Sequence, residues 1–140
     1  MVSQVKHVMW KTLNTINADA TVLDATQIMG TRSYVLILEK GKPIGIVTER
    51  DVIDKVLVAD REPNGVTVTE IMSTPIITID PDDDLVTAST VMREHNITKL
   101  LVMRENIVYG IITDMIISRH FQSYIDRATR DIIRWTPALI

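Results

Sequence analysis

The sequence lacks cysteine, long apolar runs and an excess of basic charge. Without cysteine, its 140 residues can form no disulfide, no thiolate zinc site and no cysteine nucleophile. Its longest apolar stretches, such as residues 34–38 and 107–112, fall far short of the roughly 20 residues that cross a bilayer. No signal-peptide-like hydrophobic region follows the N-terminus. The net charge of −3 does not favour nucleic acid. We therefore expect a cytoplasmic protein with no membrane segment.

The sequence does contain an internal repeat. Four apolar residues at helical spacing recur at a separation of 63: Val22, Ala25, Ile28 and Met29 correspond to Leu85, Ala88, Val91 and Met92. Further along, Gly-Ile-Val-Thr at 45–48 matches Gly-Ile-Ile-Thr at 110–113 at a separation of 65, which places a two-residue insertion near 95–98. A repeat this small buries too little apolar surface to stand alone. We expect the two copies to pack about a pseudo-two-fold axis that creates two clefts.

Both copies predict the same order of elements, β-α-β-β-α, and hence a mixed α/β (α+β) fold. A short extended piece (14–16 or 76–79) precedes a helix, with Asp19 and Asp82 placed to bond its first backbone N–H groups. Two β-rich runs joined by a tight turn follow, at 34–39 and 44–48 in one copy and at 99–104 and 108–113 in the other. They alternate little, as expected of strands covered on both faces. A closing helix is expected to begin after Thr48 and after Thr113.

The domain boundaries follow from the repeat. We assign residues 1–58 to the first copy and 66–125 to the second, with the polar stretch 59–65, which contains Pro63 and Gly65, as the linker. Residues 126–140 are predicted to be a C-terminal helical extension that packs on its own module or on a second copy, with a partner surface as the alternative. An apolar helical stripe leads into this region, formed by Ile117, Phe121, Tyr124 and Ile125. Its positive charge comes from Arg119, Arg127, Arg130 and Arg134. Trp135 and Pro137 are expected to anchor its end.

The string GIVTERDVI at 45–53 stands at a predicted strand-to-helix junction after a hairpin, and its opening recurs in the second copy. Through it the sequence resembles the cystathionine β-synthase (CBS) domain family, over roughly residues 3–122. The resemblance implies that two repeats form one non-catalytic regulatory module. It also implies a ligand sensor for AMP, ADP, ATP or S-adenosylmethionine, bound in the clefts between the repeats, and a homodimer.

Thr48 and Asp51 suit an adenosine ligand on physical grounds as well. At a strand-to-helix junction the threonine hydroxyl and the next backbone N–H groups converge on one point, where the helix dipole favours an anion such as phosphate. The two oxygens of Asp51 can accept hydrogen bonds from the 2′ and 3′ hydroxyls of ribose, and Arg50 can meet a phosphate. The alternative for the same two residues is simple helix capping.

The resemblance also assigns ligand contacts to further residues of this chain. It implies that Thr74, Pro75, Ile76 and Ile77 flank the adenine and that Ser33 and Lys99 reach phosphate. In the second cleft Thr113 is retained, but Ile116 occupies the aspartate position. We therefore expect one competent site per chain and a weak or empty second site lined by Lys11, Leu13, Asn14 and Thr113.

No residue pattern points to catalysis or to a metal. Asp80, Asp82 and Asp84 have calcium-loop spacing, yet Leu85 stands where that loop requires glycine, so we interpret them as helix-start charges. The histidines at 7, 95 and 120 have no metal-ligand spacing. We therefore predict neither an enzyme nor a required cofactor. The alternatives to a nucleotide sensor are a ligand-free structural dimer that holds a protein partner, and a nucleic-acid binder that uses the arginine-bearing tail.

Overall fold

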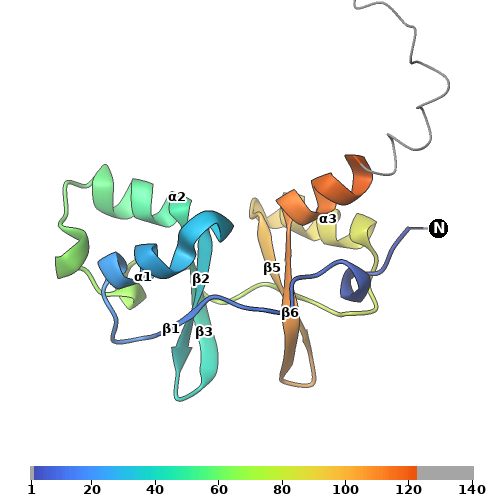
Figure 1. Cartoon of the computed structure of the whole chain (residues 1–140), viewed down its shortest axis with the longest axis horizontal. Coiled ribbons are helices and arrows are strands. Elements are labelled where there is room, and N and C mark those ends of the chain that lie inside the picture. Colours follow the sequence, from blue (N-terminus) through green and yellow to red (C-terminus); the bar gives the residue numbers. More distant parts are fainter. Residues whose placement is uncertain (1, 123–140) are drawn as a thin grey trace, which may run out of the picture. The chain divides into compact units, whose positions relative to one another are not determined.

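The computed structural model describes residues 2–122 and divides the chain into two compact units (Figure 1). Unit 1 comprises Met1–Lys11 and Thr78–Ile140, and unit 2 comprises Thr12–Ile77. Each unit contains one three-stranded sheet and its helices, so the predicted mixed α/β class is confirmed. The predicted C-terminal extension, 126–140, and the residues named from Tyr124 onward lie outside the described residues. Among residues 2–122 no helix is long and apolar enough to cross a membrane.

Unit 2 is built on a sheet of order β1-β2-β3. β1 pairs parallel to β2, and β2 pairs antiparallel to β3 with Tyr34 opposite Thr48. Its elements are β1 (Thr15–Asn17), α1 (Val22–Met29), η2 (Gly30–Arg32), β2 (Tyr34–Glu39), β3 (Lys42–Thr48), α2 (Glu49–Val52), the π-helical turn η3 (Ile53–Leu57), η4 (Pro63–Gly65) and η5 (Val68–Glu70). Residues 34–37 of the central strand are fully buried, as expected of a strand covered on both faces. Figure 1 shows α1 and α2 at the end of the hairpin opposite its turn.

Unit 1 repeats this arrangement with a sheet of order β4-β5-β6. Its elements are η1 (Val5–His7), β4 (Thr78–Ile79), α3 (Leu85–His95), β5 (Lys99–Arg104), β6 (Ile107–Thr113) and a closing helix that covers 114–122 of the described residues. The two-residue insertion lies at the C-terminal end of α3. This helix extends to His95, and its C-cap Asn96 adopts the left-handed conformation at φ 52°. α1, at the same position in the first copy, ends at Met29.

The residues that cap the first helix of each copy differ from the prediction. Thr21 and Asp84, not Asp19 and Asp82, accept hydrogen bonds from the backbone N–H groups of Asp24 and Thr87. Each true cap lies two residues nearer the helix than predicted. Asp82 instead binds the side chains of Lys6 and Arg104.

The two units exchange the opening segments of the repeats. In unit 1 the segment 3–10 packs on the second sheet: the Val5 N–H donates to the Asp83 carbonyl, and Trp10 pairs with Ile111. In unit 2 the segment 66–73 occupies the same place: the Val68 N–H donates to the Ala20 carbonyl, and Ser73 pairs with Ile46. Val5 and Val68 are both 0% exposed. The sheet of the second repeat is therefore completed by the opening segment of the first repeat, and the sheet of the first repeat by the opening segment of the second.

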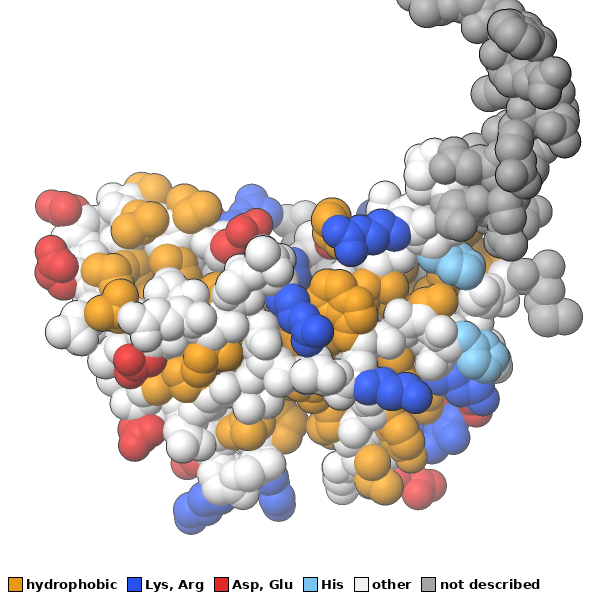
Figure 2. Space-filling model, viewed as in Figure 1, with side chains coloured by type: hydrophobic (Ala, Val, Ile, Leu, Met, Phe, Trp, Pro, Cys, Tyr) orange, Lys and Arg blue, Asp and Glu red, His pale blue; other side chains and the backbone are white. Residues whose placement is uncertain are grey.

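Unit 2 also exposes apolar side chains on its helices. Space-filling spheres in Figure 2 show hydrophobic side chains, in orange, over the α1 and α2 helices. The exposed apolar side chains of α1 are Leu23 and Ile28, and those of η3 and its C-cap are Ile53, Leu57 and Val58, with Val58 75% exposed. Surfaces of this kind are often contact surfaces.

Candidate ligand-binding site

The junction between β3 and α2 holds a buried carboxylate. Thr48 is the last residue of β3 and the N-cap of α2, and it forms a capping box with Asp51. The Thr48 amide and hydroxyl both donate to Oδ2 of Asp51, at 2.9 and 3.2 Å. Asp51 is only 8% exposed. The predicted capping role is thus observed, and it holds the carboxylate at one fixed point.

A lysine that the sequence interpretation missed also contacts this carboxylate. The Lys55 ammonium lies 3.1 Å from Oδ1 of Asp51 and donates to the Ile71 carbonyl at 2.9 Å. The spacing i, i+4 on one helix is the signal that could have identified the pair. Together with the two Thr48 bonds, this contact pairs both oxygens of a carboxylate that would otherwise be costly to bury.

Ser33 lies beside the same junction but meets it through its backbone. It adopts the left-handed conformation at φ 63°, and its carbonyl accepts the Glu49 N–H at 3.2 Å. The sequence predicts that the first backbone N–H groups of this helix bind a phosphate. The structure shows that the Glu49 N–H is used within the protein, so side chains must supply more of any phosphate contact.

The segment 73–77 lies along β3. Ser73 exchanges two backbone hydrogen bonds with Ile46, at 2.8 and 3.1 Å, and the Thr74 hydroxyl donates to the Ile44 carbonyl at 3.1 Å. The Thr74–Pro75 peptide bond is cis. Thr74 and Pro75 are exposed, whereas Ile76 and Ile77 are half-buried. The segment that the family resemblance assigns to the adenine is therefore attached to the strand that ends at Thr48.

Eight of the nine residues predicted for the first site belong to unit 2, and Lys99 belongs to unit 1. The Lys99 ammonium donates to the Thr98 hydroxyl at 2.9 Å. Arg50 is held loosely: its side chain is 76% exposed, and its Nε lies 3.6 Å from Oδ2 of Asp54. The role of Arg50 as a phosphate contact stays a prediction.

The residues predicted for the second site are divided between the units. Lys11 and Thr113 belong to unit 1, whereas Leu13 and Asn14 belong to unit 2. The Asn14 side-chain amide donates to the carbonyls of Met29 and Tyr34, both at 3.2 Å. These bonds join the end of α1 to the start of β2, so Asn14 has a structural task in unit 2.

The corresponding junction in unit 1 has the same backbone but lacks the carboxylate. The Asp114 N–H donates to the Thr98 carbonyl at 3.0 Å, as the Glu49 N–H does to Ser33 in unit 2. The Thr113 hydroxyl accepts the Ile116 N–H at 3.2 Å. Ile116, 7% exposed, occupies the position of Asp51. The junction is therefore capped in both units, but only unit 2 presents a charged acceptor there.

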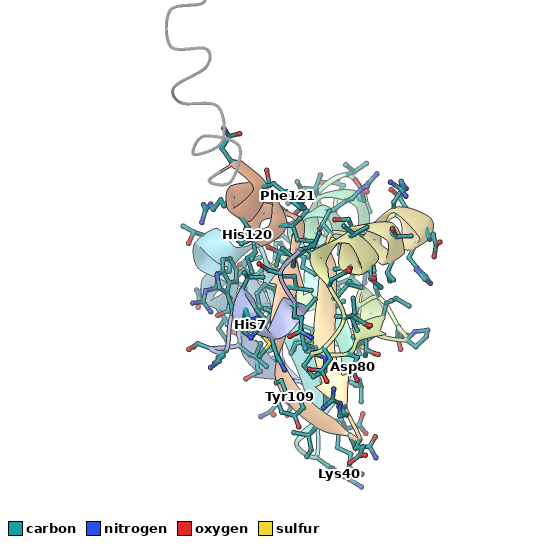
Figure 3. All side chains as sticks on the ribbon, turned by 90° about the vertical axis from the view of Figure 1, so that its right-hand side faces the viewer. His7, Lys40, Asp80, Tyr109, His120 and Phe121 are labelled. Atoms are coloured by element: carbon teal, nitrogen blue, oxygen red, sulfur yellow. The ribbon has the colours of Figure 1, made fainter. Side chains whose placement is uncertain are left out.

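His7, His95 and His120 do not form a cluster. In Figure 3 the labelled His7, in η1, and His120, on the helix 114–122, lie apart, and His95 is on α3. Within residues 2–122, no three histidine, aspartate or glutamate side chains are grouped so as to hold a metal ion. The acidic run before α3 is bound by cations of the protein: Arg104 contacts Asp80 and Asp82, and Lys6 contacts Asp82 at 2.7 Å.

Comparison with known proteins identifies the repeat. The family model for the CBS domain matches residues 5–58 and again residues 68–123. Among curated relatives, an uncharacterized protein of Methanopyrus kandleri, MK0525, is 38% identical over 85 residues, which are 60% of this chain and 43% of that protein. The CBS domain-containing protein YhcV of Bacillus subtilis is 28% identical over 112 residues, 79% of each chain. The chain thus spans less than half the length of the first of these relatives.

Solved structures agree with this assignment. The CBS domain pair of protein MJ0100, in complex with 5′-methylthioadenosine and S-adenosyl-L-methionine, is similar with a TM-score of 0.79 and 26% identity. The similarity covers 89% of this chain and 99% of that one. With two family matches over most of the chain and the same fold, this chain belongs to the CBS domain family and carries two copies of the domain in tandem.

Proposed function

We propose that the chain is a non-catalytic regulatory module that binds an adenosine-containing ligand at Thr48 and Asp51 of unit 2. The observation that carries the proposal is the Asp51 carboxylate, which is almost fully buried yet held in one orientation by Thr48 and Lys55. The complex of the MJ0100 domain pair with two adenosine compounds supports the same ligand class. A ligand bound there regulates by its difference in affinity for two states of the protein or of a protein partner.

The hydrogen-bond capacity of Asp51 limits how ribose can bind. A carboxylate offers about four acceptor sites. Oδ2 already accepts two donors from Thr48, and Oδ1 accepts one from Lys55. One ribose hydroxyl can therefore use the open site on Oδ1. The second needs the Thr48 hydroxyl to rotate away from Oδ2, which costs little because that bond, at 3.2 Å, is the longest of the three.

The group at the 5′ position of the adenosine has two candidates. An adenine nucleotide, AMP, ADP or ATP, is the first, with Arg50 and Ser33 of unit 2 as phosphate contacts. An adenosyl thioether such as S-adenosylmethionine is the second. It is favoured by the bond that already occupies the Glu49 N–H, because a ligand without phosphate needs no free amides there. The complex of the MJ0100 pair with such compounds points in the same direction.

A ligand-free structural or protein-interaction dimer is the alternative from a different class. The exposed apolar side chains of unit 2 favour it, because such side chains on helices often pack against another protein surface. Against it stands the intact carboxylate site: a purely structural module needs no buried aspartate where its own second copy has Ile116.

Isothermal titration of the full chain with AMP, ATP, S-adenosylmethionine and 2′-deoxy-AMP tests the proposal. We expect saturable binding of about one ligand per chain, because only one junction has the aspartate. Affinity for 2′-deoxy-AMP should be about ten-fold or more below that for AMP, since a hydrogen bond to a charged acceptor is lost.

The variant Asp51→Asn removes the charge at nearly constant size and should weaken AMP binding by about ten-fold or more. Asp54→Asn is the matched control, since it removes a carboxylate three residues further along whose partner is the exposed Arg50. It should leave the ratio of the AMP and 2′-deoxy-AMP affinities within about two-fold, because both ligands carry the same phosphate for Arg50. Failure of every ligand to bind at millimolar concentration would contradict the proposal and favour the structural dimer.

A further inference from the structure

Lys55 joins two parts of the candidate site. Its ammonium contacts Oδ1 of Asp51 at 3.1 Å, and it also donates to the carbonyl of Ile71 at 2.9 Å. Ile71 is 1% exposed and lies two residues before Ser73, which is hydrogen-bonded to β3. One side chain therefore connects the carboxylate to the backbone that leads into the segment 73–77.

A second ion pair on the same helical stretch shows that this contact is more than a surface pair. Arg50 and Asp54 have the same i, i+4 spacing, but they are 3.6 Å apart and their side chains are 76% and 60% exposed. The Asp51 side chain is 11% exposed and that of Lys55 46%. Solvent screens the outer pair strongly and the inner pair much less.

The second copy of the repeat supplies an internal comparison. At a separation of 65, Asp51 corresponds to Ile116 and Lys55 to His120, so both partners of the pair change together. His120 lies 3.1 Å from the Ser3 hydroxyl and so contacts the opening segment of unit 1 by another route. The chain thus has a lysine at this position in the copy with the carboxylate and not in the copy without it.

We propose that Lys55 is a positioning residue for the ligand, and that it gives the site its preference for ribose. This inference rests on the proposed function. By holding Oδ1, Lys55 keeps the Asp51 carboxylate in the plane fixed by the Thr48 bonds and leaves one acceptor site of Oδ1 for a ribose hydroxyl. Through Ile71 it also holds the segment 73–77 in register with that carboxylate. Lys55 itself need not touch the ligand.

The test compares AMP with 2′-deoxy-AMP on variants of the full chain. Lys55→Met removes the charge and the donor but keeps the length of the side chain, and Lys55→Arg restores both. Asp54→Asn is the control for loss of an i, i+4 ion pair from the same helical stretch. Lys55→Gln, which keeps a donor for the Ile71 carbonyl, replaces Lys55→Met if thermal melting shows that Lys55→Met does not fold.

The readout is the ratio of the two affinities. We expect the unchanged protein to favour AMP by about ten-fold or more, and Lys55→Met to reduce this ratio to about three-fold or less. Lys55→Arg should recover most of the ratio, and Asp54→Asn should keep it. An equal loss for both ligands in Lys55→Met would indicate a merely structural lysine and overturn the inference alone. Failure of the unchanged protein to bind either ligand would overturn the proposed function, and the inference with it.

Discussion

Gly45 and Gly110 occupy the same position in the two hairpins, and each lies against the opening segment of its own unit. A Cβ atom added at Gly45 would collide with the side chain of Met72, which is flexible. A Cβ atom added at Gly110 would collide with the backbone carbonyl oxygen of Trp10. That carbonyl accepts the Ile111 N–H at 2.9 Å, so it cannot move without breaking the pairing of the segment.

We therefore expect Gly110→Ala to destabilise its unit more than Gly45→Ala does. Overpacking of this kind costs about 1–3 kcal/mol, and we place Gly110→Ala near the upper end and Gly45→Ala near the lower end. Urea unfolding followed by circular dichroism measures both free energies of unfolding. Equal losses, or a larger loss for Gly45→Ala, would show that the Trp10 backbone is more easily displaced than its pairing indicates.

At the residue scale, the sequence was sufficient to identify Thr48 and Asp51 as a pair, because a Thr-x-x-Asp string at a strand-to-helix junction has few geometries open to it. Lys55 was missed as a partner of Asp51, although its spacing was visible. Its second bond, to the Ile71 carbonyl, could not have been predicted, because it depends on where a segment sixteen residues away packs.

Among the elements, η5 offers a test of pH dependence. Thr67 and Glu70 form a capping box, and Arg61 contacts Oε1 of Glu70 at 2.9 Å. The hydrogen bond from the Thr67 backbone, and then the Arg61 guanidinium, lower the pKa of Glu70 from 4.5 to about 2. Because the folded pKa is the lower one, Glu70 contributes its full stability above pH 4.5 and loses it as the pH falls toward 2.

The variant Glu70→Gln isolates this contribution from other carboxylates with a lowered pKa, such as Asp80 and Asp84. We expect the variant to unfold at a lower urea concentration than the unchanged protein above pH 4.5. The gap between the two midpoints should narrow as the pH falls toward 2, where about half of the Glu70 carboxylates are protonated in the folded protein. A gap that stays constant over this range would mean that the Glu70 charge contributes nothing.

The elements themselves could largely be predicted. The predicted runs 34–39 and 99–104 match β2 and β5, because short runs of β-branched and aliphatic residues between turn signals usually form strands. The helix caps could not be predicted as well. Asp82 is a suitable cap by type, but its carboxylate is bound by Lys6 and Arg104, residues that are distant in sequence. Tertiary contacts outweighed the local preference.

At the scale of the whole molecule, the main feature is the exchange of opening segments. Val5 belongs to the first repeat by sequence, yet it is buried in unit 1 with the sheet of the second repeat. Val68 belongs to the second repeat and is buried in the core of unit 2. The repeat pattern could not reveal this exchange. The two opening segments have matching residues at a separation of 63, so the sequence does not show which of the two sheets each segment packs on.

The exchange predicts where two matched substitutions act. Val5→Ala should lower the hydrogen-exchange protection of β5 and β6, and Val68→Ala that of β2 and β3, because each leaves a cavity in one core. We expect each to lower local stability by about 1–3 kcal/mol, as a small buried deletion does. Mass spectrometry of peptides from both sheets measures the protection. Loss in β2 and β3 on Val5→Ala would contradict the exchange.

An NMR titration of the ¹⁵N-labelled chain with AMP shows directly whether adenosine binds at Asp51. A ligand bound at Asp51 should shift the amide signals of residues 48–51 and of Ser73, Thr74, Ile76 and Ile77, and 2′-deoxy-AMP should do so only at higher concentration. The corresponding amides at 113–116, where Ile116 replaces the aspartate, should respond weakly or not at all. Shifts confined to 113–116, or no shifts at millimolar AMP, would contradict an adenosine site at Thr48 and Asp51.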